Sequence, residues 1–317
     1  MHTVLLLGAG FSKNWGGCLA REVMYDVLGR IAEDSALHGY VSRIGNFEDA
    51  LSQVQSQYKH DRSDGSKARL VRLQNAILET FNAMNQAFAA KPSMEFSNMI
   101  EYSIQAFLWK FDAIFTLNQD LLIEMHYKPE LYDRRRRTGS YCFPGMQPPS
   151  NWRSALPCDL LHAAWHPMAQ FALEANHQHI YKLHGSANWR DTEGGELLVM
   201  GADKQSIIRD KPILAWYGDE FRRHLEMPGT RLMVVGYGFR DQHIDDTIYE
   251  AWQRKGLQMF VVNTQGRSVF NKQSSTQIKV PDRMEMIPLI GISDRELGST
   301  FGGDHFEYGK LKRFFDA

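Results

Sequence analysis

The stretch MHTVLLLGAGFSK at residues 1–13 decides the fold. His2–Leu7 is a continuous apolar run of the kind that is buried on both faces in a parallel sheet. It ends at Gly8-Ala9-Gly10, a turn of small residues. Apolar residues then recur at intervals of four, as on one face of a helix: Leu19, Val23, Val27 and Ile31. A strand, a glycine turn and a helix in this order predict the first unit of an α/β fold.

Four later apolar runs have the same character, and each ends at a polar residue or a glycine. They are residues 113–117, 180–183, 231–235 and 259–262, followed by Asn118, His184, Gly236 and Asn263. The carboxyl ends of parallel strands meet at one edge of the sheet, where ligands bind in open α/β folds. We therefore predict an α/β protein with a Rossmann-like parallel sheet, helices on both faces and an inserted helical module.

The inserted module is predicted from helical patterns between the first two strands. Residues 70–88 form an amphipathic stripe, 96–109 are a second apolar-periodic stretch, and DRSDGS at 61–66 predicts a turn before them. We place the core at 1–18 plus 110–317 and the helical insertion at 19–109. Further along the chain, we expect a short helix around 160–175 and one or two short strands within 199–216.

Composition limits the class of protein. Hydrophobic residues make up 43% of the chain, enough for a substantial core, which excludes a disordered chain. The 36 Lys and Arg balance 37 Asp and Glu, which argues against direct nucleic-acid binding by bulk attraction. Three scattered cysteines give neither a disulfide framework nor a paired-cysteine zinc site. Since no apolar run reaches the roughly 18 to 20 residues that cross a bilayer, we expect a cytoplasmic protein without a membrane segment.

The Gly8-Ala9-Gly10 turn has the geometry that cradles a pyrophosphate, and Ser12 could add a hydroxyl. The alternative is that a tight strand-to-helix turn needs glycine for steric reasons alone. The pattern departs from GxGxxG because the third glycine comes only at Gly16 or Gly17, and the region where an acidic residue would follow is helical. These departures disfavour an ordinary nicotinamide dehydrogenase.

Polar residues at the other strand ends are candidates for chemistry, each with a structural alternative. Asn118 and Asp120 could fix a sugar hydroxyl or a water, or could simply cap the helix at 121–127. His184 could act as a base near neutral pH, or could be a structural histidine. After the apolar run at 231–235, Asp241 is a plausible helix cap. Asn263 could hold a ribose hydroxyl or form a turn.

Two further clusters have weaker functional interpretations. His162 and His166 stand four residues apart, near His177 and His179, but an acidic partner at a metalloprotease-type position is missing, so we expect no metal. The basic run Arg134–Arg137 is typical of a solvated loop, or could contact an acidic partner or a nucleotide phosphate. The sequence contains neither a GxSxG elbow nor a Walker loop, which excludes serine hydrolases of that type and P-loop nucleotidases.

Taken in order, the blocks GAGFS (8–12), TLNQD (116–120), KLHGSANW (182–189), VVGYGFRDQHID (234–245) and VVN (261–263) resemble the sirtuin superfamily. They are most similar to divergent sirtuin-like proteins of bacterial antiphage defence. Deacylating sirtuins carry a zinc held by four cysteines in two pairs, which three cysteines cannot supply. The resemblance therefore implies the NAD-hydrolysing branch of the superfamily.

The resemblance also implies roles for individual residues. The pyrophosphate of NAD+ would lie against Gly8, Ala9, Gly10, Phe11 and Ser12. Asn118 and Asp120 would face the nicotinamide ribose, with His184 as the catalytic base. The adenosine half would bind Gly236, Tyr237, Gly238 and Asn263.

The function implied is hydrolysis of NAD+ to ADP-ribose and nicotinamide, with NAD+ as substrate, as the effector of an antiphage, abortive-infection system. Control would come from homo-oligomerisation or a sensor protein; family relatives are paired with a HerA-type ATPase, an Argonaute-related protein or a nucleotide-sensing subunit. Two alternatives stay open. One is an NAD-dependent deacylase or ADP-ribosyltransferase, and the other is a non-catalytic subunit that senses NAD or an ADP-ribose derivative.

Overall fold

The computed structural model describes residues 1–129, 139–201, 204–271 and 283–316. The basic run Arg134–Arg137 lies outside the described residues. Within them, no helix combines the length and apolar character that a membrane span requires.

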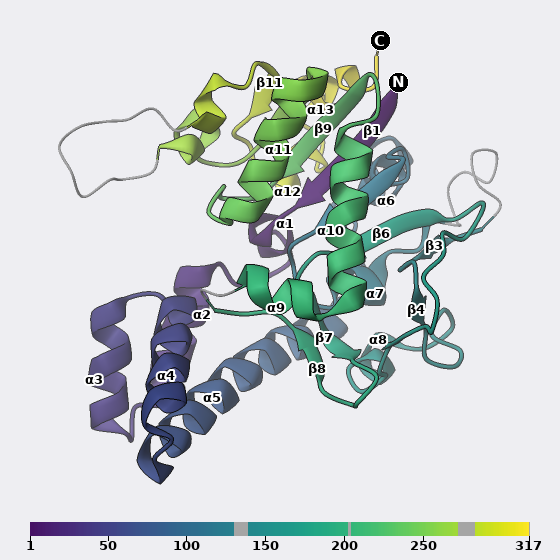
Figure 1. Cartoon of the computed structure of the whole chain (residues 1–317). Helices are drawn as coiled ribbons and strands as arrows, with labels where there is room; N and C mark the ends of the chain where they lie inside the picture. The colour runs from purple at the N-terminus through teal and green to yellow at the C-terminus, as the bar shows by residue number, and fades with distance from the viewer. Residues whose placement is uncertain (130–138, 202–203, 272–282, 317) are drawn as a thin grey trace.

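A central parallel sheet forms the middle layer (Figure 1). Its seven strands in the described residues run in the order β11-β10-β9-β1-β2-β6-β3, and neighbouring strands pair in parallel. Their bounds are β1 His2–Leu7, β2 Ala113–Thr116, β3 Tyr141–Cys142, β6 Gln178–Lys182, β9 Thr230–Val235, β10 Gln258–Val262 and β11 Leu289–Ser293. The apolar run at the start of the chain is the central strand, and Val4–Leu7 are fully buried. The predicted Rossmann-like α/β fold is confirmed.

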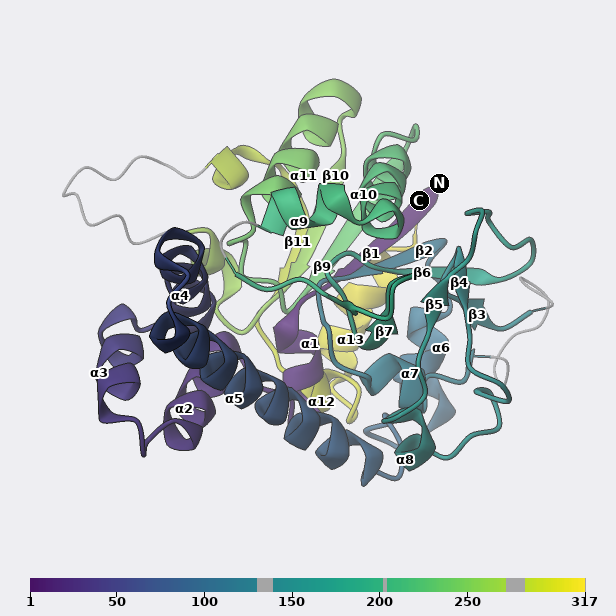
Figure 2. The ribbon, with the colours of Figure 1, turned by 60° about the horizontal axis from the view of Figure 1, so that its bottom comes forward.

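Helices cover both faces of this sheet (Figure 2). On one face lie α10 (Pro212–Leu225) and α11 (Gln242–Lys255), with α10 packed on β9 and β6. On the other face lie α12 (Leu297–Thr300) and α13 (His305–Arg313), with α13 packed on β11. Burial on both faces explains why the central strands are continuous apolar runs rather than alternating ones.

Four helices between β1 and β2 project to one side of the sheet (Figure 1). They are α2 Ala20–Arg30, α3 Ser35–Ile44, α4 Phe47–Asp61 and α5 Asp64–Ala89. Side chains of Asp34, Asn46 and Ser63 accept hydrogen bonds from backbone N–H groups at the starts of α3, α4 and α5. The predicted helices after Leu19 and over 70–88 are confirmed, and the turn at 61–66 is shorter than predicted. The division into core and insertion stays a prediction; we call α2–α5 the helical module.

The prediction of one long helix over 96–109 is wrong. Only a 3-10 turn at Ile100–Tyr102 and the short α6 at Ile104–Leu108 form there. The hydroxyls of Ser93 and Ser97 accept hydrogen bonds from backbone N–H groups two residues on, which favours turns over helix. The carboxylate of Glu95 accepts from the N–H of Ile104 and the hydroxyl of Ser103, so the helix begins only there.

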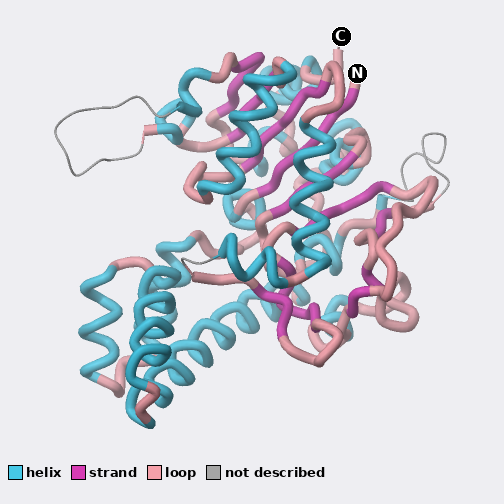
Figure 3. The backbone as a smooth tube through the Cα atoms, in the orientation of Figure 1, coloured by secondary structure: helices cyan, strands magenta, loops and turns pink. Residues whose placement is uncertain are grey.

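Two further predictions are wrong. The helical piece expected at 160–175 is α8 at Pro157–Leu160, and the chain beyond it is loop and a two-residue strand, β5 (His166–Pro167), that pairs with β4 (Met146–Gln147) (Figure 3). The strands expected within 199–216 are α9 (Lys204–Asp210) and the start of α10. Proline at the first position of α10 suits a helix start, and its buried residues fall at helical spacing: Ile213, Leu214, Tyr217 and Phe221. The nearest strand, β8 (Glu196–Leu198), comes earlier and pairs with β7 (Gly185–Arg190).

Candidate functional site

The carboxyl edge of the sheet brings the predicted residues onto neighbouring loops. Thr116 of β2 is paired with Lys182 of β6, and Asn118 and His184 each lie two residues beyond this pair. The Leu183 N–H donates to the carbonyl of Thr116 at 2.9 Å, which keeps the two strand ends together. On the other side of β2, the N–H of Leu117 donates to the carbonyl of Leu7, just before the glycine turn. The predicted meeting of these loops at one edge of the sheet is therefore observed.

Asn118 links the second strand end to the glycine turn. Its side chain is almost buried, and Nδ2 donates to the carbonyl of Gly8 at 3.0 Å and to Oγ of Ser12 at 2.9 Å. The backbone N–H of Asn118 donates to Oγ1 of Thr116. Since both N–H bonds of the amide are used within the protein, Oδ1 is the atom of this side chain that remains to accept a hydrogen bond from a ligand.

The glycine turn packs directly against the loop after β9. The N–H of Gly8 donates to the carbonyl of Val235, and the N–H of Gly10 donates to the carbonyl of Gly236 at 2.8 Å. Gly236 has φ +65°, and a Cβ added there would lie 2.3 Å from the backbone nitrogen of Phe11. Glycine is thus required at position 236 for close packing of the two backbone segments. This steric need is the alternative to pyrophosphate binding that the sequence leaves open for such glycine turns. The N–H of Phe11 is bound to the carbonyl of Gly8, whereas Ala9 is exposed.

His184 is buried and lies beside a second histidine. Its Nε2 is 3.4 Å from Nε2 of His243, in the first turn of α11. Burial lowers the pKa of His184 to about 3, against the opposing charge of Asp241. Burial also lowers the pKa of His243, again opposed by Asp241. Both imidazoles are therefore neutral near pH 7 in this arrangement, and each has a ring nitrogen that can accept a proton.

Sequence reasoning missed His243 as a site residue. The signal is present, because His243 belongs to the block at 234–245, but the roles predicted within that block fall on other residues: Gly236, Tyr237, Gly238 and Asp241. Asp241 is the N-cap residue of α11, as predicted, but its side chain makes no capping hydrogen bond. Its carboxylate is bound to Nζ of Lys204 at 2.8 Å. Tyr237 serves the helix start instead, because its hydroxyl accepts from the Asp241 N–H and donates to Oδ1 of Asp245.

Asp120 shapes the loop after β2. Its Oδ1 accepts a hydrogen bond from the N–H of Leu122, at the start of α7 (Leu122–His126). This contact corresponds to the structural alternative for Asp120, in which its side chain caps the helix. Its backbone carbonyl accepts from Nζ of Lys182 at 2.5 Å. Lys182 also forms a buried ion pair with Glu124 at 2.6 Å and donates to Oγ of Ser186 at 2.7 Å. This network joins the loops that carry Asn118 and His184.

The residues predicted for the adenosine half lie at the ends of β9 and β10. The N–H of Gly236 donates to the carbonyl of Val262, which ties the two strand ends together. Asn263 Nδ2 donates to the carbonyl of Tyr237 at 3.1 Å, and its Oδ1 accepts from the N–H of Gln265 at 2.9 Å. Asn263 thus holds the turn after β10 against the segment that contains Gly238. The structure brings this group next to the glycine turn.

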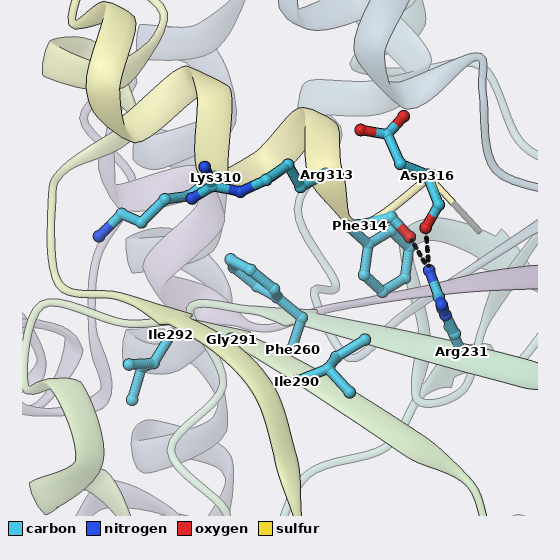
Figure 4. Close-up of a pocket in the computed structure, with 9 residues that line it drawn as sticks. All are labelled: Arg231, Phe260, Ile290, Gly291, Ile292, Lys310, Arg313, Phe314 and Asp316. Carbon is cyan, nitrogen blue, oxygen red and sulfur yellow. Dashed lines mark hydrogen bonds between the residues drawn. The ribbon is translucent and has the colours of Figure 1, made fainter.

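A cavity of about 240 Å³ lies away from these residues, toward the amino ends of β9 and β11 (Figure 4). Arg231 at its edge donates to the carbonyl oxygens of Phe314 and Asp316, and Lys310 pairs with Glu307. Two of the positively charged side chains that line the cavity are thus engaged within the protein.

The described part of the chain holds no cluster of three or more His, Cys, Asp or Glu side chains suited to a metal ion. His162 and His166 lie beyond the end of α8 rather than on one helix.

Comparison with known proteins gives the family. No curated protein matches the chain. The SIR2-like domain profile matches residues 112–279, more than half of the 317 residues, and this range contains Asn118, His184 and Gly236. The glycine turn at residues 8–10 precedes the matched range. The chain belongs to the SIR2-like domain family, whose members bind NAD+, and this membership indicates an NAD-related function.

Proposed function

We propose that this protein hydrolyses NAD+ to ADP-ribose and nicotinamide, and that it does so in the cytoplasm as the effector of an antiphage, abortive-infection system. The observation that carries the proposal is the convergence of Ser12, Asn118 and His184 at the carboxyl edge of one sheet. Family membership supports an NAD-related function. The resemblance of the sequence blocks to sirtuin-like proteins of antiphage defence supports the specific reaction and role.

The chemistry requires few groups. Cleavage of the nicotinamide–ribose bond builds positive charge on the sugar, as in glycoside hydrolysis, and nicotinamide leaves as a neutral molecule. The catalytic groups must therefore hold the ribose and position a water, and a base must accept a proton from that water or from a ribose hydroxyl. In this proposal Oδ1 of Asn118 accepts a hydrogen bond from the ribose or the water. His184, which burial keeps neutral, is the base, and the charge of Asp241, which raises the pKa of His184, would stabilise the imidazole once it has accepted the proton.

The remaining residues would bind the rest of the dinucleotide. The pyrophosphate would approach the turn from Gly8 to Ser12 at the exposed Ala9, with Gly10 and Phe11 fixing the shape of the turn. Asp120 would face the nicotinamide ribose through Oδ2, since Oδ1 is bound to Leu122. The adenosine half would lie over the segment from Gly236 to Gly238, with Asn263 supporting it.

Burial at the site supports gated activity. His184 is only 3% exposed and Asn118 only 9%, so little of either side chain is open to a dinucleotide in this structure. An enzyme that consumes the NAD+ of its own cell must be inactive until it is needed. We propose that self-association or a sensor protein opens the site. The partner would be of the kinds that the resemblance implies: a HerA-type ATPase, an Argonaute-related protein or a nucleotide-sensing subunit.

The test is release of nicotinamide from NAD+, measured for the protein alone and with the products of its neighbouring genes. Asn118→Ala and His184→Ala are each expected to lower the rate by about a hundredfold or more, because His184 is the positioned base and Asn118 orients the group that loses the proton. His60→Ala, at an exposed position of α4, is the control and keeps the parent rate. Release at the parent rate by either site variant would refute the assigned roles.

The burial of His184 also favours a second candidate, a subunit that binds NAD or an ADP-ribose derivative without turning it over. Calorimetric binding of NAD+ with no nicotinamide release, in the presence of each partner, would support this candidate over the enzyme. Mass analysis of the products separates hydrolysis from the other alternative, because a deacylase or transferase yields acylated or protein-linked ADP-ribose instead of free ADP-ribose.

A further inference from the structure

A chain of charged side chains connects the helical module to the histidine pair. Glu48 of α4 binds Nζ of Lys204 at 2.8 Å, and the same Nζ binds Oδ1 of Asp241 at 2.8 Å. Asp241 stands two residues before His243, whose ring faces His184. Lys204 begins α9, which lies between α4 and the start of α11 (Figures 1 and 2). Three segments that are distant in sequence therefore meet at one ammonium group.

These charges are largely withdrawn from solvent. The side chain of Lys204 is 13% exposed and that of Asp241 is 20% exposed. Burial raises the pKa of Glu48, and Lys204 opposes this effect. The pKa of Lys204 is raised because Asp241 and Glu48 outweigh the effect of its burial. The Asp241 carboxylate thus depends on the shared ammonium group, since a buried charge without a partner is strongly destabilising. The side chain of Glu48 is 30% exposed and depends on Lys204 less.

The charges also act on the two imidazoles. Besides burial, the groups that shift the pKa of His184 are Asp241, which raises it, and Lys204 and His243, which lower it. Asp241 and Lys204 act on His243 with the same signs. A change in how tightly Lys204 holds Asp241 therefore changes the field at both rings.

We propose that Lys204 and Asp241 are positioning residues for the His184–His243 pair, and that Glu48 is the point at which the helical module acts on that pair. The inference rests on the proposed function, in which His184 is the base. While α4 stays in place, Glu48 holds Lys204 against Asp241, and the ammonium group offsets the effect of the carboxylate on the two imidazoles. Displacement of α4 by a partner or a second copy would release Lys204 and leave the charge of Asp241 uncompensated beside the two imidazoles.

The test is the titration of the two histidines, followed by NMR of histidine-labelled protein without NAD+. Removal of the ammonium group in Lys204→Met is expected to raise the titration midpoint of His243 by about one pH unit, because an uncompensated carboxylate favours the charged imidazole. Asp241→Asn is expected to lower it. Lys204→Arg keeps the charge and is expected to keep the midpoint near that of the parent protein.

Glu48→Gln tests the link to the module and preserves the side-chain shape if Lys204→Met fails to fold. It is expected to shift the resonances of His243 and His184. The matched control is Glu79→Gln in α5, where Glu79 pairs with Arg30 on the surface of the module, and it leaves both signals in place. Unchanged histidine signals in Glu48→Gln and Asp241→Asn would overturn the inference. These signals are read without substrate, so a parent protein that never releases nicotinamide would refute the proposed function alone.

Discussion

The amide nitrogen of Asn118 lies 2.9 Å from the hydroxyl oxygen of Ser12, although 106 residues separate them in the sequence. Asn118 lies inside the range matched by the family profile, and Ser12 lies before it. The contact makes the amino-terminal turn part of the same site as the loop after β2. It also fixes the direction in which Oδ1 of Asn118 points.

We therefore predict that Ser12→Ala lowers nicotinamide release about fivefold, because loss of one orienting hydrogen bond worth about 1 kcal/mol leaves the amide free to turn. The measurement is the initial rate at saturating NAD+. Ser154→Ala is the control, since that exposed hydroxyl donates only to the nearby carbonyl of Asn151. Equal rates for the two variants would show that Ser12 does not orient Asn118.

Gly236→Ala is expected to destabilise the fold by more than the 1–2 kcal/mol that left-handed backbone costs an ordinary residue. The added methyl group would also meet backbone atoms of Gly10 and Phe11 at less than van der Waals distance. Urea unfolding gives the free energy. Gly29→Ala in α2 is the matched control: its added Cβ meets no described atom within 4 Å, and it should stabilise the helix by about 0.4–1 kcal/mol.

Stability is expected to fall between pH 8 and pH 5. Burial lowers the pKa of His184 and that of His224 to about 3 each, below the value of about 6.5 in an unfolded chain. The unfolded state therefore binds more protons between these values, and stability is lost as the pH falls below about 6.5. Each histidine should contribute about 2 kcal/mol of this loss at pH 5.

Urea unfolding at several pH values measures this slope. His184→Asn is expected to reduce the loss at pH 5 by about 2 kcal/mol. His60→Asn, at an exposed position, is expected to leave the slope unchanged. A slope in His184→Asn as steep as in the parent protein would mean that His184 does not stay neutral in the folded state.

The rate of nicotinamide release by an activated complex is expected to change little between pH 8 and pH 6. A base with an ordinary histidine pKa would lose about three quarters of its active form over this range. In the activated complex the bound dinucleotide would cover His184 in the opened site, so the burial that lowers its pKa to about 3 persists and the ring stays neutral. The pH profile of kcat for the parent protein checks this, and a fourfold fall centred near pH 6.5 would argue for a protonated His184.

Lys182→Met is expected to destabilise the protein by about 3–5 kcal/mol, because it leaves the buried carboxylate of Glu124 without its cation. The double variant Lys182→Met with Glu124→Leu removes both charges and should recover most of that loss. Unfolding free energies of the single and double variants decide this. A double variant as unstable as the single one would show that Lys182→Met destabilises the protein through lost packing rather than through the unpaired charge of Glu124.

The sequence predicts those parts of the fold that depend on local pattern. The central strand and its glycine turn follow from an apolar run buried on both faces, and the four later strands follow in the same way. The stretch at 96–109 has apolar residues at helical spacing, but Glu95, Ser93 and Ser97 bind the backbone and favour turns there. The spacing of apolar residues does not predict such hydrogen bonds between side chains and backbone.

The residues of the candidate site likewise include some that the sequence predicts and some that it does not. Asn118 and His184 could be selected because each follows a strand, and parallel strands end at a common edge. Glu48 and Lys204 could not, because their contact joins two helices 156 positions apart in a chain of 317 residues. The histidine pair likewise depends on the way α11 sets its first turn over the end of β6.

The contact between the turn at Gly8 and Gly10 and the loop at Gly236 has a consequence for ligand affinity. Backbone lies on backbone there, with two hydrogen bonds and no room for a side chain. Neither segment can adjust without the other, so a dinucleotide would meet a preformed floor and little ordering entropy would be lost on binding. Selectivity at that floor would then come from ligand shape, and a bulkier analogue would be rejected rather than accommodated.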